Sequence, residues 1–414
     1  MTDRAVVFVC GKDPLAEISG GHSHYVRAHA HAAIAAGYEP HLFCVGSSPS
    51  VSESGFGVVH RVRSLPPYRQ IGVPWHAGIL ARAIRRAFPV CPVIHSFGLW
   101  GWAGVLAARA RGPRGAPVRT IVNMYTAHPE ESKSQVRSLD RDFSSLRARL
   151  SYRSQALWSV LVLARWERRM LHESDRVVVN YESVRRLLES RYGSLPNGLR
   201  LPYGPESVTP GGGETARPPA VPGSPFRILC VARHESRKGI RVLLDALARM
   251  DRSGASFRAR LVGAGPLLDS HRRLARRLAI DDRVEIVGAL PEIGGELRDA
   301  DVLVLPSLEE QSGSMALLEA MQAGLPAVVS GVDGLLEDVE AERSALVVPP
   351  GDAAALAGAI ERLRCEPALR LRISRGASEA YRLRFEPRHL ADALGRLYAE
   401  MAGQDTPRSQ GRRI

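Results

Sequence analysis

The chain has 414 residues, a length that predicts two domains, because single cores rarely grow beyond about 250–300 residues. Its apolar fraction of 45% excludes a disordered chain, and its longest clean internal apolar run, Leu157–Ala164, is far shorter than the roughly 20 residues of a membrane span. The net charge of +13 comes from scattered arginines, with three lysines among 56 basic residues and no basic run interleaved with aromatic residues, so nucleic-acid binding is not expected.

The first half of the chain alternates short apolar runs with helical stretches. A buried-strand pattern at Ala5–Cys10 is followed by a glycine-containing loop and by a helical stretch that ends at Gly37. Four more short apolar runs follow it: "HLFCVG", "PVIHSF", "VRTIVNMY" and "DRVVVN". Because these runs lack the polar alternation of a half-exposed sheet, they predict a parallel sheet covered on both faces.

A linker divides the chain near its middle. Residues 205–225 hold six prolines and four glycines, a composition that sustains neither a helix nor a central strand. The predicted domains are therefore residues 1–204 and 226–385. The fold class expected is α/β, with two doubly wound, Rossmann-like domains that face each other across a cleft.

The second half repeats the strand–helix rhythm, from "FRILCVA" to "ALVVPP". In doubly wound sheets, ligands bind beyond the carboxyl ends of the strands, so the loops at those ends are the candidate sites. A last helix is predicted at Pro387–Met401, inside a segment 386–403 that is expected to pack back towards the N-terminal domain. The polar, basic residues 404–414 are expected to be a disordered tail.

The loop "VARHESRKG" carries cations between a predicted strand and a predicted helix. Arg233 and Lys238 would lie at the positive end of the helix dipole, next to Gly239 with its open backbone. Lysine is rare in this chain, and a lysine point charge beside an arginine fork suits a diphosphate. The alternative is an exposed loop with ordinary surface charges.

The stretch "EEQSGSMALLEAM", Glu309–Met321, predicts a second anion site. It places a loop before a strong helix former, so the backbone amides of Gly313, Ser314 and Met315 would be free to meet a phosphate. Glu319 would project from a helix flanked by buried strands. A carboxylate there is costly unless it is hydrogen-bonded, and sugar hydroxyls would supply such bonds.

No metal site is expected. The histidines of "HSHYVRAHAH" suggest zinc, but His24 and His31 would lie two helical turns, about 10 Å, apart. Surface or cleft histidines are the preferred interpretation, with His24 able to touch a ligand. The acidic triplets Asp140–Asp142 and Asp299–Asp301 imitate a metal-binding motif, but the second leads directly into a predicted strand and is interpreted as a strand cap.

The second half closely resembles the nucleotide-sugar-binding domain of GT-B-fold, family 4 glycosyltransferases (group 1). The matching stretches, in family order, are "RHESRKG", "LVGAGP", "RVEIVG", "DADVLVLPS", "SGSMALLEAMQAGLPAVVS", "GLLEDV" and "ALVVPPGD". The first half matches less tightly, through "SGGHSHYVRAHAHAAIAAGYEPHLF", "VIHSF", "YTAH" and "SDRVVVNYESVRRLL". Together they cover nearly the whole chain apart from the linker and the tail.

The resemblance implies transfer of a sugar from a nucleotide diphosphate donor, with UDP-sugar favoured, and retention at the anomeric carbon. No cofactor or metal is implied. Carried over by position, Arg233 and Lys238 would hold the diphosphate and stabilise the leaving group. Glu319 would bind the ribose hydroxyls, and the amides after Gly313 would lie near the phosphate. The paired glycines Gly20 and Gly21 would line the phosphate side of the cleft from the first domain.

One site residue departs from the family pattern, because Gln311 stands where the family has glutamate. Gln311 would face the donor's sugar hydroxyls, which an amide can bind as donor and acceptor; Glu310 could take this place through a one-residue shift of the loop. A catalytically degenerate binding protein, or another GT-B enzyme such as a sugar-nucleotide epimerase, is the alternative. His128 in "YTAH" falls near the family's first-domain histidine at the reacting centre, with His95 as a fallback.

The acceptor expected is a glycan, a lipid-linked or a small-molecule compound, as in polysaccharide or secondary-metabolite biosynthesis. Five scattered cysteines without a CxxC pair and an N-terminus unlike a signal peptide favour a cytoplasmic protein, free or peripheral at the inner membrane face. Lys133–Met170 carries nine basic and three acidic residues with two tryptophans. It is either a helical insertion packed on the first domain, part of an acceptor pocket, or an amphipathic segment on an anionic membrane.

Overall fold

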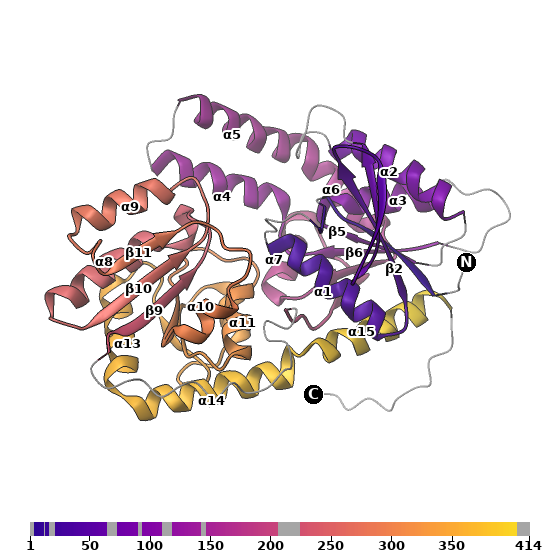
Figure 1. The fold of residues 1–414 in the computed structure, drawn as a ribbon. Coiled ribbons are helices and arrows are strands. Elements are labelled where there is room, and N and C mark those ends of the chain that lie inside the picture. The colour runs from indigo at the N-terminus through magenta and orange to yellow at the C-terminus, as the bar shows by residue number, and fades with distance from the viewer. Residues whose placement is uncertain are drawn as a thin grey trace.

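The computed structural model describes residues 4–11, 13–15, 21–63, 73–89, 93–109, 118–141, 146–205 and 224–403. Two parallel sheets flanked by helices form two α/β units, which confirms the predicted fold class (Figure 1). The predicted linker lies outside the described residues except at its ends, and the predicted tail lies outside them entirely.

The first sheet has eight strands in the order β3-β4-β2-β1-β5-β6-β7-β8. All neighbouring pairs are parallel except the β3–β4 hairpin, which the sequence analysis did not predict. The hairpin was missed because β3, "SVSES", is a mostly polar edge strand without an apolar run. The strands are β1 (Ala5–Val9), β2 (Glu39–Gly46), β3 (Ser50–Ser54), β4 (Gly57–Arg63), β5 (Val93–Phe97), β6 (Arg119–Met124), β7 (Arg176–Val179) and β8 (Gly198–Arg200).

Helices cover this sheet on both faces. Every residue of β1 and β5 is buried, as expected for strands without polar alternation. The region predicted as a helical insertion is helical, apart from four residues that are not described, and α4 packs against α5. The helices are α1 (Gly21–Ala35), α2 (Val73–Ala87), α3 (Gly101–Arg109), α4 (His128–Arg141), α5 (Leu146–Trp158), the π-helix η3 (Ser159–Leu163), α6 (Ala164–Glu173) and α7 (Glu182–Tyr192), with the 3₁₀ helix η2 (Gly98–Trp100).

The second sheet has six strands, all parallel, in the order β11-β10-β9-β12-β13-β14. Asp301, in the acidic triplet before β12, accepts a hydrogen bond of 2.8 Å from the backbone N–H of Arg227, which fits a strand cap. The strands are β9 (Phe226–Val231), β10 (Phe257–Val262), β11 (Val284–Val287), β12 (Val302–Leu305), β13 (Ala327–Ser330) and β14 (Leu346–Val348).

The second unit carries most of the remaining helices. The chain order reverses at the β9–β12 pair, as it does at β1–β5 in the first sheet, and crevices for ligands form at such points. The helices are the 3₁₀ helix η4 (Ser236–Lys238), α8 (Ile240–Arg252), α9 (Leu268–Arg277), α10 (Gly294–Asp299), α11 (Met315–Gln322), α12 (Asp333–Asp338), α13 (Ala353–Cys365), α14 (Pro367–Arg384) and α15 (Pro387–Met401).

The last helix returns to the first unit, where α15 packs against α1 (Figure 1). Its Tyr398 is buried and its hydroxyl lies 2.7 Å from Nδ1 of His95. Arg176 of β7 forms an ion pair of 2.6 Å with Glu400. One buried apolar cluster contains residues of both units, so they share part of their core. Among the described helices, none is both long and apolar enough to cross a bilayer.

Candidate active site between the two domains

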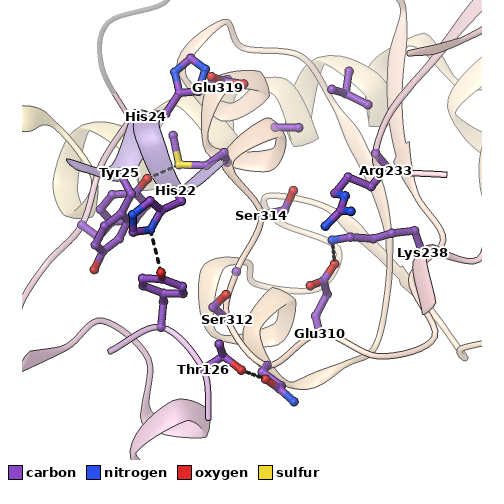
Figure 2. A pocket seen from close by; sticks show the side chains of 18 of the residues that line it. His22, His24, Tyr25, Thr126, Arg233, Lys238, Glu310, Ser312, Ser314 and Glu319 are labelled. Carbon is purple, nitrogen blue, oxygen red and sulfur yellow. Dashed lines mark hydrogen bonds and ion pairs between the residues drawn. The ribbon is translucent and has the colours of Figure 1, made fainter. Parts of the chain in front are cut away.

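A cavity of about 910 Å³ lies between the two units (Figure 2). The first unit lines it with residues of α1 and with residues after β6 and β7. The second unit lines it with residues after β9, with the loop 290–294 and with residues 309–316 after β12. The cavity is therefore bounded by loops at the carboxyl ends of parallel strands, which is where this class of sheet binds ligands.

The cationic loop after β9 reaches this cavity. Arg233 and Lys238 both line it, and Figure 2 shows the two side chains close together. The Arg233 guanidinium is 58% exposed and pairs with Glu235 at 2.7 Å. Gly239 ends the loop with a φ of +65°, and a Cβ there would collide with the carbonyl oxygen of Pro306. Only glycine combines this left-handed backbone with so close an approach.

Glu310 is the buried partner of the cations. Its side chain is 5% exposed and accepts from the Lys238 ammonium, from Arg237 Nη1 at 3.2 Å and from Ser307 Oγ at 3.2 Å. Burial lowers the pKa of Lys238 below its usual value, and the charge of Glu310 opposes this shift. Glu310, expected as a donor-binding residue, thus lines the cavity while holding Lys238 in place.

Gln311 lies at the contact between the two units. Its side-chain oxygen accepts a hydrogen bond from Thr126 Oγ1, and its backbone carbonyl accepts one of 2.9 Å from Ser183 Oγ. Both donors belong to the first unit. Figure 2 shows the Thr126 contact at the edge of the cavity, away from Arg233 and Lys238. The residue that departs from the family pattern therefore lines the cavity and also bridges the two units.

The N-terminus of α11 opens onto the cavity as predicted by its sequence. Gly313, Ser314, Met315 and Glu319 all line it. Ser314 is the N-cap residue, and its side chain makes no capping hydrogen bond. The first backbone N–H groups of this helix are therefore not capped by the Ser314 side chain. N–H groups without such a cap can donate to an anion at the helix N-terminus.

Gly313 is fixed by its surroundings. A Cβ at this position would collide with the hydroxyl of Tyr181 and with the carboxyl group of Asp338. Tyr181 donates a hydrogen bond of 3.2 Å to Asp338, which is 1% exposed. Burial raises the pKa of Asp338 to about 8. The backbone of Gly313 therefore passes against a closely packed inter-unit contact.

His128 does not line the cavity, contrary to expectation. It is the first residue of α4, is 8% exposed, and its backbone N–H donates to Glu167 at 3.2 Å. Burial lowers the pKa of its imidazole to about 4, whereas burial raises that of Glu167 to about 7. The fallback, His95, is fully buried against Tyr398. Neither side chain is in position to touch a substrate in this cavity.

Two other histidines occupy the place expected of His128. His22 and His24, in the first turn of α1, line the cavity (Figure 2). His22 Nδ1 lies 2.6 Å from the Tyr125 hydroxyl, and Arg27 donates to His24 Nδ1 at 2.9 Å. His24 agrees with the expectation that it could touch a ligand, whereas His22 was not singled out, although it directly follows the paired glycines. Gly20 lies outside the described residues, and Gly21 begins α1.

The clustered histidines do not converge on one point. His29 is buried and its Nδ1 lies 2.9 Å from the carbonyl oxygen of Tyr25. His31 packs edge-on against Phe56. Across the described ranges, no group of three or more histidine, cysteine, aspartate or glutamate side chains is arranged to hold a metal ion.

A carboxylate from the second unit caps a helix of the first. Glu337 accepts from the backbone N–H groups of Glu182 and Ser183 at 2.8 and 2.7 Å, and pairs with Arg200 at 3.2 Å. Burial opposes ionisation, but these hydrogen bonds and Arg200 lower the pKa of Glu337 below its usual value. The N-terminus of α7 is thereby fixed against α12, which holds one side of the cavity closed.

Two family models match the chain. The model described as Glycosyl transferases group 1 matches residues 225–365, and the model described as Glycosyltransferase Family 4 matches residues 19–201. Together they cover both units of the fold.

The curated relatives match part of the chain. The putative colanic acid biosynthesis glycosyltransferase WcaL of Escherichia coli (strain K12) is 39% identical over 148 residues, 34% of this chain and 36% of that protein. The D-inositol 3-phosphate glycosyltransferase of Saccharomonospora viridis is 35% identical over 253 residues, 56% of this chain and 57% of that protein. The chain thus aligns with about a third to rather more than half of these relatives' length.

Solved structures match the fold over nearly its whole length. Sucrose-phosphate synthase from Thermosynechococcus elongatus superposes with a TM-score of 0.77 at 24% identity, covering 97% of this chain and 99% of that one. Anabaena Alr3699/HepE in complex with UDP and glucose superposes with a TM-score of 0.67 at 16% identity, covering 95% and 99%. With both family models matched in chain order on this fold, the chain belongs to the family 4, group 1 glycosyltransferases of GT-B architecture.

Proposed function

We propose that this protein transfers a sugar from a nucleoside diphosphate donor, most favourably a UDP-sugar, to a glycan, lipid-linked or small-molecule acceptor, with retention at the anomeric carbon. The observation that carries the proposal is the convergence of Arg233, Lys238 and the α11 N-terminus on one inter-unit cavity. The relative WcaL is named as a putative colanic acid biosynthesis glycosyltransferase, and the HepE structure holds UDP and glucose.

Two cations of different shape suit a diphosphate. The exposed Arg233 guanidinium offers a planar fork to phosphate oxygens, while the Lys238 ammonium acts as a point charge beside it. Backbone amides at the start of α11 add a partial positive charge on the same cavity. As the sugar leaves, negative charge grows on the diphosphate, and these groups stabilise it without a metal ion or cofactor.

The remaining cavity residues suit the sugars of the donor and the acceptor. Glu319 supplies a carboxylate for ribose hydroxyls from α11, and Gln311 supplies an amide near the donor sugar. His22 and His24 face the same space from the first unit, where the acceptor would enter. Glu337 and Gln311 hold the two units together beside this space, and closure of the units around the substrates would limit hydrolysis of the donor by water.

A nucleotide-sugar-binding protein without transfer activity is the second candidate. The observation that favours it is the Thr126–Gln311 hydrogen bond, which occupies the side-chain oxygen of Gln311 with the first unit. The chain would then keep donor affinity and lack turnover, so binding and transfer have to be measured separately.

The test is calorimetric binding of UDP, GDP and ADP, each with and without an attached sugar. Lys238→Ala and Glu319→Ala should each weaken binding roughly 10- to 100-fold, the value of a lost charge-assisted hydrogen bond. Arg249→Ala, an exposed arginine on α8 outside the cavity, is the matched control and should bind as the wild type does. Equal affinities in all variants would refute the site.

Gln311→Glu separates the two candidate functions. If the sugar adds affinity in the wild type, and labelled sugar is passed to an acceptor, Gln311 is part of a working pocket. If the sugar adds affinity only in Gln311→Glu, the wild-type site binds nucleotide without holding its donor sugar, and the transferase proposal fails.

A further inference from the structure

Three exposed leucines lie along one side of the α5–η3 segment. Leu150 and Leu157 are each 60% exposed and are two turns apart on α5, so they share a face. Leu161 is 51% exposed and follows four residues later in the π-helix. Large apolar side chains gathered on a surface in this way mark an interaction site more often than chance exposure.

The opposite side of the same segment is anchored in the first unit. Leu163 is 1% exposed and packs in a small cluster with Val73 and Leu99, with Trp158 partly buried against it. Trp75, two residues beyond Val73 on α2, is 57% exposed. The exposed leucines are thus held on a fixed element, and the α2 helix that anchors it carries an exposed tryptophan, a residue that favours membrane–water interfaces.

Cations continue this surface onto α6. Arg165 and Arg168 are exposed and, with Arg191 and Tyr192 of α7, line a shallow cavity of about 430 Å³. The acidic residue nearest to them in sequence, Glu167, is 1% exposed and faces the interior. It is also the one acidic residue between positions 146 and 172 of the sequence. Arg191 is paired with Glu130 at 2.6 Å, so the positive charge that this surface presents comes from Arg165 and Arg168.

We propose that this leucine–arginine face, formed by Leu150, Leu157, Leu161, Arg165 and Arg168, docks on the surface of an anionic lipid bilayer. Leucine side chains would enter the interfacial layer while the arginines meet lipid phosphates. The net charge of +13 adds long-range attraction to an anionic surface. This proposal is independent of the donor-site assignment, because none of these five residues lines the large cavity.

The position of the face suits delivery of an acceptor carried by lipid. Helix α5 lies at the outer edge of the molecule, with α4 on its inner side (Figure 1). α4 packs against α5 and contributes Glu131 and Ser134 to the wall of the inter-unit cavity. A bilayer on the leucine–arginine face would therefore lie one helix away from the proposed reacting centre.

The test is co-sedimentation of the full chain with vesicles of phosphatidylcholine alone or mixed with phosphatidylglycerol. The wild type should bind the mixed vesicles and not the neutral ones. Arg165→Ser/Arg168→Ser should weaken binding about fivefold for each arginine removed. Leu157→Ser/Leu161→Ser should weaken it on the order of tenfold, because apolar insertion is lost.

Matched variants elsewhere keep the experiment decisive. Leu371→Ser/Leu383→Ser changes two exposed leucines of α14, and Arg249→Ser/Arg252→Ser changes two exposed arginines of α8; both should bind vesicles as the wild type does. Unchanged melting temperatures in every variant show that the fold is intact, whether or not the protein binds UDP. Equal loss in face and control variants, or no binding of the wild type to anionic vesicles, would overturn the proposal.

Discussion

Replacing the buried carboxylate of Glu310 by an amide tests whether this residue sets the charge of Lys238. Glu310 accepts from the Lys238 ammonium, from Arg237 Nη1 at 3.2 Å and from Ser307 Oγ at 3.2 Å. Glu310→Gln keeps the size of the side chain and removes its charge. Burial already lowers the pKa of Lys238, and Glu310 opposes this, so the variant should lower the pKa further.

The stability effect should be large. Removing one partner of a buried ion pair costs about 3–5 kcal/mol, because the other charge is left uncompensated. Arg237 keeps Glu235 as a partner at 3.1 Å, and the Lys238 side chain is 15% exposed. The loss in free energy of unfolding should therefore lie near the lower end, about 3 kcal/mol. Glu53→Gln, the same charge change at an exposed position of β3 outside the cavity, should stay within about 0.5 kcal/mol.

The pH dependence of nucleotide binding should change in a defined direction. In the proposed site a diphosphate would bind the protonated form of Lys238, so affinity should be full below the lysine pKa and should fall as the pH rises through it. Because Glu310→Gln lowers this pKa, the fall should begin at a lower pH than in the wild type. Calorimetry between about pH 7.5 and about pH 9.5 measures how the affinity for UDP changes with pH. The affinity should fall by at most about tenfold per pH unit, because one proton is lost.

The wild type measured over the same pH range accounts for titration of the nucleotide itself. If Glu310→Gln and the wild type lose affinity in parallel, Glu310 does not control the charge of Lys238. If, in addition, the variant unfolds at the wild-type denaturant midpoint, the ion pair contributes nothing and the description of this buried cluster is wrong.

Two further substitutions test the packing around the cavity. Gly313→Ala should lower the melting temperature and weaken UDP binding, because the added Cβ would collide with Tyr181 and Asp338. The control is Gly358→Ala on α13, where the added Cβ meets open space. This variant should have an unchanged or higher melting temperature. Asp338 has a folded pKa of about 8, so the native state binds its proton more tightly and stability should fall as the pH rises towards 8, by at most about 1.4 kcal/mol per unit. Asp338→Asn cannot titrate and should flatten this slope in urea unfolding between about pH 5.5 and 8.5; an unchanged slope would contradict the assignment.

Local sequence signals predicted much of the fold and several second-unit residues that line the inter-unit cavity. Apolar runs without alternation predicted the parallel strands, and the proline- and glycine-rich segment predicted the division of the chain. Lys238 was found because lysine is rare in this chain and because it precedes a glycine at the start of a helix. Gly313 and Glu319 were found from the helix pattern around them. Each of these signals lies within about ten residues, the range over which periodicity and capping act.

The first-domain side of the site was not predictable in the same way. The sequence offered His128 and His95 as candidates, and the structure buries both. It brings His24, which was expected to be able to touch a ligand, to the cavity together with His22, because α1 faces the cleft with its first turn. Motifs in the first half match the family loosely, so position along the chain was a poor guide to position in space.

The sequence by itself determined most of the segments that form strands and helices and the loops that follow the strands, because those depend on nearest neighbours along the chain. Only the tertiary structure decided which side chains meet. Gln311 bonds to Thr126 from 185 positions away, and Glu337 caps α7 from 154 and 155 positions away. Glu310 turns to Lys238 within its own unit, whereas its neighbour Glu309 accepts a hydrogen bond of 3.2 Å from Ser134 Oγ, 175 positions away in the first unit. Such contacts follow from how two separate sheets pack against each other, and local propensity carries no information about that packing.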